Sequence, residues 1–227
     1  MDIGVFGATG VIGRRVVAEG SRRGHRVTAF TRSASRVPAD PGPVRWSVTQ
    51  MLDVADVARA VSGLDVIVNA INAGDDIPGA IANADVLPAA TRVLLTALES
   101  HPATRLIVIG GAGSLEVRPG LQVVDVAGFA ERLPETLGVP TEYVNVVLAH
   151  REVLHLCRLS DRSWTYLSPS AGLITPGART GRFRVGGNQL LVTADGISDI
   201  SAEDLAMAVV DEVELPRHVQ RRFTVGY

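Results

Sequence analysis

The feature that most constrains this chain is a glycine-rich turn between an apolar strand and a helix, close to residue 1. The apolar residues 3–6 lead directly into Gly7-Ala-Thr-Gly-Val-Ile-Gly13, and a helical pattern follows. Gly7 permits a tight turn, Gly10 lets a pyrophosphate approach the backbone, and Gly13 lets the helix pack close to the sheet. The start of the helix favours phosphate through free N–H groups and its dipole. The turn therefore predicts a dinucleotide site at Gly7, Thr9, Gly10, Val11, Ile12 and Gly13.

Short apolar runs alternate with helical patterns along the rest of the chain. Strands are expected at residues 3–6, 26–30, 44–48, 65–70, 105–109 and 163–167. Most of them are apolar throughout, as is typical of strands covered on both faces. Helices are expected at residues 11–23, 54–61, 84–100 and 143–159. With right-handed crossovers, this order predicts an α/β fold with a doubly wound parallel sheet of the Rossmann type.

The length and punctuation of the chain indicate one domain. A chain of 227 residues can bury a substantial core, and it contains no internal repeat or linker. Residues 112–138 and 168–188 are rich in glycine and proline, and Ser201 resembles the cap of a further helix. We therefore predict a single domain over residues 1–227, in which residues 168–227 add a small loop-rich C-terminal lobe on the substrate side.

The composition excludes several classes of function. The chain has 22 basic residues against 24 acidic ones, so its field attracts neither nucleic acid nor an anionic membrane. No apolar run approaches the length of a membrane span. All the basic residues are arginine, which excludes Schiff-base chemistry and lysine-containing phosphate loops. The single cysteine, Cys157, excludes an internal disulfide and is interpreted as a core residue. With a strand beginning near residue 2, this predicts a cytoplasmic protein without a signal peptide.

The end of the second expected strand distinguishes NAD from NADP. An acidic residue there would bind the adenosine ribose, whereas this chain has Thr31-Arg32-Ser33. Arg32 could hold a 2′-phosphate and Ser33 could add a hydroxyl donor. The alternative is that Arg32 is only a solvated surface arginine. We therefore predict that NADP(H) is preferred over NAD(H).

Other positions are expected along the dinucleotide. Asp53 could meet the adenine amino group or could only cap the next helix, and the two roles are compatible. Ala70 and Ile71 follow the fourth strand at the switch point of the sheet, where a cofactor would pass. Asn69 could be structural. Pro169 closes the sixth strand, and backbone groups there could hold the nicotinamide carboxamide.

Several segments together carry a family resemblance. They are the glycine turn and residues 110–117, 164–169, 179–184, 200–204 and 222–227. The chain resembles the atypical short-chain dehydrogenase/reductases, and more narrowly the NADH-flavin reductase family related to biliverdin IXβ/flavin reductases and NmrA-like proteins. The resemblance covers nearly the whole chain. It implies NADP(H) binding and reduction of a flavin or similar acceptor.

The residues for alcohol oxidation are missing. Short-chain dehydrogenases ordinarily use a tyrosine with a lysine four positions later, but Tyr143 is followed at that spacing by Val147. A tyrosine without that cation keeps a pKa near about 10 and is a poor base at neutral pH. Hydride transfer to a flavin or quinone asks less of the protein, because the ring delocalises the charge and water delivers the proton.

Two residues are candidates for the acceptor side. Ser114 follows the fifth strand and could bind the acceptor or the nicotinamide amide, or could only satisfy the backbone of its loop. His150 could donate a proton, or could be an ordinary packed or solvated helix residue. A lid is expected at residues 177–187, where Arg179, Arg182 and Arg184 could contact phosphate or an anionic acceptor. The alternative, for at least two of these arginines, is that they are only solvated. No spacing of His, Cys, Asp or Glu suggests a metal site.

These patterns leave more than one function open. The first is an NAD(P)H-dependent oxidoreductase that transfers hydride to a flavin, quinone or similar conjugated acceptor. The alternative is a non-catalytic NADP(H)-binding redox sensor of the NmrA-like type. An epimerase or dehydratase ranks last, because that chemistry usually uses the missing Tyr–Lys pair. The sequence also leaves open whether the chain forms a homodimer.

Overall fold

The computed structural model describes all 227 residues and contains a central eight-stranded sheet. Its strand order is β3-β2-β1-β4-β5-β8-β10-β9, and every neighbouring pair is parallel except β10 and β9. The bounds are β1 Asp2–Phe6, β2 Arg26–Thr31, β3 Arg45–Val48, β4 Val66–Asn69, β5 Arg105–Ile109, β8 Trp164–Ser168, β9 Arg184–Gly186 and β10 Arg221–Gly226. This confirms the predicted doubly wound sheet. Strands β6 (Glu116–Arg118) and β7 (Leu121–Gln122) form a separate hairpin.

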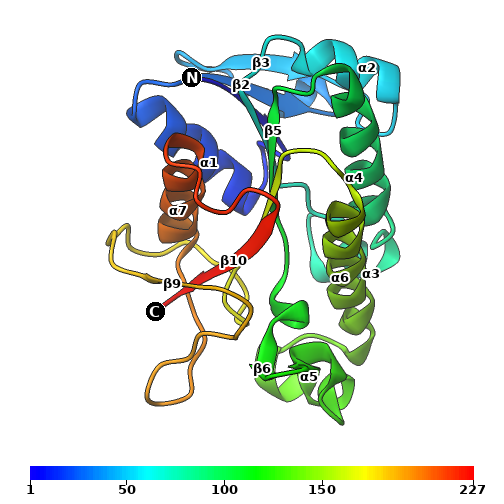
Figure 1. The fold of residues 1–227 in the computed structure, drawn as a ribbon, viewed down its shortest axis with the longest axis vertical. Helices are drawn as coiled ribbons and strands as arrows, with labels where there is room; N and C mark the ends of the chain where they lie inside the picture. Colours follow the sequence, from blue (N-terminus) through cyan, green and yellow to red (C-terminus); the bar gives the residue numbers. More distant parts are fainter.

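Helices cover both faces of the sheet (Figure 1). Helices α1 (Val11–Arg22) and α7 (Ala202–Glu214) pack on one face, and α2 (Val54–Val61), α4 (Val86–Ala97) and α6 (Val144–Leu159) pack on the other. Two short helices, α3 (Ile77–Ala82) and α5 (Phe129–Leu137), complete the set. Each face buries its own apolar cluster, which explains why the central strands are apolar throughout. No helix combines the length and the apolar composition needed to cross a membrane.

Local signals account for where the main helices begin and end. Asp53 caps α2 through a carboxylate that accepts the N–H of Asp56, and Ser201 caps α7 by accepting the N–H of Asp204. Gly24 has a φ of +81° directly after the end of α1, a conformation that favours glycine. The predicted caps are therefore confirmed.

Six elements differ from the sequence expectation, which had no helix at α3 or α5 and no strand at β6, β7, β9 or β10. Helix α5 contains Pro134 and lies in a segment rich in glycine and proline, so its pattern was interpreted as a loop. Strand β10 begins with Arg221-Arg222 and has few apolar residues, although residues 222–226 are all buried in the sheet. Both elements depend on contacts with distant parts of the chain.

The loops gather at the carboxyl ends of the parallel strands. Residues 112–138, with β6 and α5, lie at the same end of the molecule as much of the segment between β8 and α7 (Figure 1). Helix α7 and strand β10 fall within residues 168–227 but join the central layers. The assignment of residues 168–227 to the substrate side stays a prediction.

Candidate functional site

The glycine turn brings β1, α1 and the end of β4 into direct backbone contact. Gly7 has a φ of +74°, and a Cβ there would lie 2.3 Å from the carbonyl oxygen of Ala70. A Cβ on Gly13 would lie 2.1 Å from the carbonyl oxygen of Gly7. Such distances are far inside van der Waals contact, so only glycine fits at either position. The turn thereby packs against Ala70 and Ile71, at the predicted switch point.

The start of α1 is open for a phosphate. Gly10 is the N-cap, and no side chain caps the helix. A Cβ built on Gly10 would meet only the carbonyl oxygen of Gly7, at 3.3 Å, so the outer surface of the turn is otherwise free. The N–H groups of the first helical turn have no partner within the helix. The predicted residues, Thr9 to Gly13, therefore fit the pyrophosphate of a dinucleotide.

The end of β2 presents one free guanidinium. Arg32 is exposed and makes no hydrogen bond or ion pair, whereas Arg36 is paired with Asp75. The hydroxyl of Ser33 accepts the N–H of Ser35 at 3.3 Å and caps a short 3-10 turn. Arg32 is thus available to a ligand, and the Ser33 hydroxyl is already part of the local turn.

Two further residues at this edge of the sheet have local structural roles. The carboxylate of Asp53 caps α2, as described above, which leaves its predicted adenine contact a prediction. The side-chain oxygen of Asn69 accepts the N–H of Ile71 at 3.2 Å. Asn69 therefore shapes the backbone that packs on the glycine turn.

Ser114 is buried and is held by an arginine that the sequence did not indicate. Arg222, on β10, donates to the Ser114 hydroxyl at 3.2 Å and to its carbonyl oxygen at 2.6 Å. The same guanidinium donates to the side-chain oxygen of Asn188 at 2.9 Å. Arg222 is only 8% exposed, so it ties the last strand to the loops that follow β5 and β9. A charged residue in a short strand gives no sequence signal for such a role.

His150 lies on α6 against the backbone of Gly111. A Cβ on Gly111 would lie 3.2 Å from the imidazole Cγ, and the buried Nδ1 of His150 has no hydrogen-bond partner in the protein. Burial lowers the pKa of His150 to about 4, so its imidazole is neutral at physiological pH. Nearby, the Tyr166 hydroxyl donates to the His150 carbonyl at 2.8 Å and accepts the N–H of Gly111 at 3.2 Å. Burial raises the pKa of Tyr166.

Unpartnered hydroxyls lie at the carboxyl ends of β8 and β10. Ser168 and Thr224 are opposite each other in the parallel register, and the side-chain oxygens of both are buried without a partner. Ser170 has the same property and follows Pro169 directly. Buried polar groups without partners are few in folded proteins, and each calls for a ligand, a water or a functional role. The sequence pointed only to Pro169 and Ser170 here.

The arginines of the expected lid do not act as a group. Arg179 pairs with Glu19 of α1 at 2.9 Å, and Arg184 donates to the carbonyl oxygen of Val192 at 2.7 Å. Arg182 is exposed and has no side-chain partner. Other parts of the protein therefore hold the guanidinium groups of Arg179 and Arg184, and a ligand contact for any of the three stays a prediction.

The sheet order and the glycine turn define a dinucleotide-binding Rossmann protein. A model of the NAD(P)H-binding family matches residues 7–216. The chain is 37% identical over 227 residues to YwnB, an uncharacterised protein of Bacillus subtilis. The alignment covers 99% of this chain and 98% of YwnB. The chain therefore belongs to the NAD(P)H-binding family, within the atypical short-chain dehydrogenase/reductases, and its cofactor class is a nicotinamide dinucleotide.

Solved structures agree with this fold. A protein of Burkholderia pseudomallei, provisionally named as exported, is 38% identical with a TM-score of 0.84, and both chains are covered completely. A provisional epimerase of Bacteroides thetaiotaomicron is 29% identical with a TM-score of 0.83, covering 100% of this chain and 96% of that one. A provisional NADH-flavin reductase of Streptococcus pneumoniae is 24% identical with a TM-score of 0.81, covering 100% and 99%.

Proposed function

We propose that this chain is an NADPH-dependent oxidoreductase that transfers hydride to a flat conjugated acceptor, such as a flavin or a quinone. The observation that carries the proposal is that the titratable side chains beside the candidate site are poor proton donors at neutral pH. His150 is neutral, and burial raises the pKa values of Tyr143 and Tyr166. A carbonyl substrate would require a donor, whereas a conjugated ring spreads the incoming charge and takes its proton from water.

Each part of the dinucleotide has residues to hold it in this proposal. The glycine turn from Gly7 to Gly13 binds the pyrophosphate, and Arg32 with the backbone near Ser33 binds the 2′-phosphate of NADPH. Asp53 lies on the adenine side. Ala70, Ile71 and Pro169 border the path of the cofactor toward the nicotinamide end. A bound NADPH would supply the hydride.

Ser114 and His150 orient the acceptor in this proposal. The Ser114 hydroxyl accepts a hydrogen bond from Arg222, so its own hydrogen is free to donate to a carbonyl or ring nitrogen of the acceptor. The neutral imidazole of His150 has an unpartnered ring nitrogen and can form a hydrogen bond without transferring a proton. The name of the Streptococcus pneumoniae relative agrees with a flavin acceptor.

A redox sensor is the second candidate, and a specific observation favours it. The position four residues after Tyr143 is Val147, which packs against Gly113 and supplies no cation to the tyrosine. A protein with this site could bind NADP(H) and change its contacts with a partner without catalysis. A cytoplasmic location and a homodimer also stay predictions.

The test is NADPH oxidation by the purified chain with FMN, riboflavin, a quinone or no acceptor. We expect acceptor-dependent multiple turnover that is faster with NADPH than with NADH. The variant Gly187→Ala serves as a folded control, because a Cβ there meets nothing within 4 Å. Tight binding of NADPH without turnover on any acceptor would reject the reductase and favour the sensor. No binding of either cofactor would reject both.

A further inference from the structure

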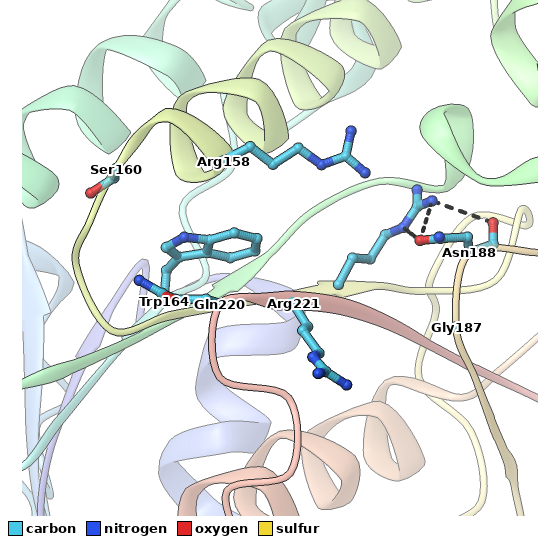
Figure 2. A pocket seen from close by; sticks show the side chains of 8 residues that line it. Arg158, Ser160, Trp164, Gly187, Asn188, Gln220 and Arg221 are labelled. Atoms are coloured by element: carbon cyan, nitrogen blue, oxygen red, sulfur yellow. Dashed lines mark hydrogen bonds between the residues drawn. The ribbon is translucent and has the colours of Figure 1, made fainter.

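A second pocket lies away from the glycine turn, on the face of the sheet that α6 covers only in part. It has a volume of about 480 Å³ and is lined by Arg158, Ser160, Trp164, Gly187, Asn188, Gln220, Arg221 and Arg222 (Figure 2). Trp164 begins β8 and Arg221 begins β10, so the pocket lies toward the amino ends of these parallel strands. The candidate cofactor site lies at the opposite, carboxyl ends.

The charges around this pocket are unbalanced. Arg158, in the last turn of α6, is exposed and makes no hydrogen bond or ion pair. Arg222 is buried, and its hydrogen-bond partners, Ser114 and Asn188, are both neutral. Burial and the positive charge of Arg158 both lower the pKa of Arg222. Neither the Arg158 guanidinium nor the Arg222 guanidinium has a carboxylate within 4 Å. Glu116 therefore raises the pKa of Arg222 only through its charge at longer range.

Two free donors face the charge of Arg222. All hydrogen bonds of Arg222 go to Ser114 and Asn188, so Arg222 contributes charge rather than a donor. The Arg158 guanidinium and the side-chain N–H₂ of Asn188 have no partner. Ser160 accepts the N–H of Arg162 and lies on the far side of Trp164 from Asn188, so it takes no part (Figure 2). Arg221 points away from Arg158 and takes no part (Figure 2).

The backbone beside the pocket is held in an unusual conformation. Gln220 has a φ of +52°, and no other residue except glycine has a positive φ. Its N–H donates to the carbonyl oxygen of Trp164 at 2.6 Å, and its side chain donates to the carbonyl oxygen of Arg162 at 3.3 Å. Such conformations persist where the surroundings enforce them, and they are frequent at binding sites. The turn sets the direction in which β10 starts and therefore the place of Arg222.

We propose that this pocket binds a small oxyanion of the phosphate class, with donors from Arg158 and Asn188 and with the uncompensated charge of Arg222 behind them. A guanidinium fork matches the oxygens of a phosphate, and an anion between two cations relieves their mutual repulsion. The volume also admits a small group attached to the phosphate. The ligand is therefore either inorganic phosphate or a small phosphate monoester. This proposal does not rest on the reductase activity, although Arg222 also holds Ser114.

The two tryptophans allow a local test by NMR. Trp164 lines the pocket, and Trp46 lies on β3 at the opposite edge of the sheet. Inorganic phosphate and glycerol phosphate are titrated at constant ionic strength while the two indole N–H resonances are followed. We expect a saturable shift of the Trp164 resonance and none for Trp46. A lower Kd for inorganic phosphate would identify the free ion as the ligand, and a lower Kd for glycerol phosphate would identify a monoester.

Two substitutions decide the assignment. Arg158→Gln should raise the Kd at least about tenfold, since a charged hydrogen bond of this kind carries about that factor. Arg45→Gln removes another exposed arginine without ion pairs, on β3, and should leave the Kd unchanged. A shift that never saturates, a shift shared equally by Trp46, or an unchanged Kd in Arg158→Gln would each overturn the proposal.

Discussion

Arg222 donates a hydrogen bond to the Ser114 hydroxyl at 3.2 Å, although the two residues are 108 positions apart in the sequence. The same guanidinium donates to the Ser114 carbonyl oxygen at 2.6 Å. The candidate donor to the acceptor is therefore placed by the last strand of the sheet. Because the Ser114 oxygen accepts from an arginine, its remaining hydrogen is directed away from Arg222.

The variant Ser114→Ala tests this donor. We expect the turnover rate to fall roughly tenfold to a hundredfold, at or below the roughly hundredfold to thousandfold loss seen when one donor to a full oxyanion is removed. Affinity for NADPH should stay nearly unchanged, because Ser114 is not among the residues proposed to hold the dinucleotide. Steady-state rates and fluorescence titration with NADPH measure the two effects, with Ser160→Ala as the matched control. An unchanged rate would leave Ser114 with a purely structural role.

The variant Arg32→Glu tests cofactor preference. Arg32 is exposed without a partner, so its replacement should cost little stability. A carboxylate in its place would repel the 2′-phosphate, and we expect NADPH affinity to fall at least about tenfold more than NADH affinity. The control Arg45→Glu makes the same charge change on the neighbouring strand. Equal losses for both cofactors would remove the 2′-phosphate assignment.

The variant Gly13→Ala tests the close packing of the glycine turn. Its Cβ would lie 2.1 Å from the Gly7 carbonyl oxygen, so α1 must shift away from the turn. We expect a loss of about 1–3 kcal/mol in the free energy of unfolding, as for other overpacked sites, together with weaker binding of both cofactors. Urea denaturation and cofactor titration measure these losses. Gly187→Ala, which meets no atom within 4 Å, should match the wild type. A Gly13→Ala variant with unaltered stability and binding would show that the turn tolerates a side chain.

The buried imidazole of His150 predicts a pH dependence of stability. Its folded pKa of about 4 lies below the unfolded value of about 6.5, so the unfolded chain binds the proton more tightly. Above pH 6.5 the imidazole is neutral in both states and does not reduce the free energy of unfolding. As the pH falls from 6.5 toward 4, the free energy of unfolding should decline, by about 1–2 kcal/mol at pH 5. Urea denaturation across this range measures the decline.

Two substitutions on α6 isolate this effect. In His150→Gln the decline between pH 6.5 and 5 should be smaller than in the wild type, because no imidazole remains to be protonated. His155→Gln replaces an exposed histidine of the same helix and should keep the wild-type decline. A decline of equal size in all three proteins would mean that other groups cause it.

The parts of the fold that could be predicted are those with local signals. The apolar runs indicated the central parallel strands, and Asp53 and Ser201 marked the starts of α2 and α7. The glycine spacing also predicted the close approach of helix and sheet at Gly13, which packs on the Gly7 carbonyl group. The contact of Gly7 with Ala70 was not predicted. The predicted features depend on neighbouring residues or on a turn whose geometry is set by glycine itself.

The features that could not be predicted depend on distant contacts. A buried arginine in β10 contradicts the usual preference of that residue for the surface, and only Ser114 and Asn188 make its burial tolerable. The unpartnered hydroxyls of Ser168 and Thr224 likewise follow from the pairing of β8 with β10. No local pattern distinguishes these groups from ordinary surface residues.

The position of β10 has a consequence for how the sheet assembles. Strand β10 lies between β8 and β9 in the sheet, but β9 and α7 separate it from β8 along the chain. Until β10 pairs with β8, that strand presents an open edge with unpaired backbone groups. Pairing between segments so far apart in the sequence is slow compared with local contacts, so the partly folded chain is most exposed to aggregation before β10 docks.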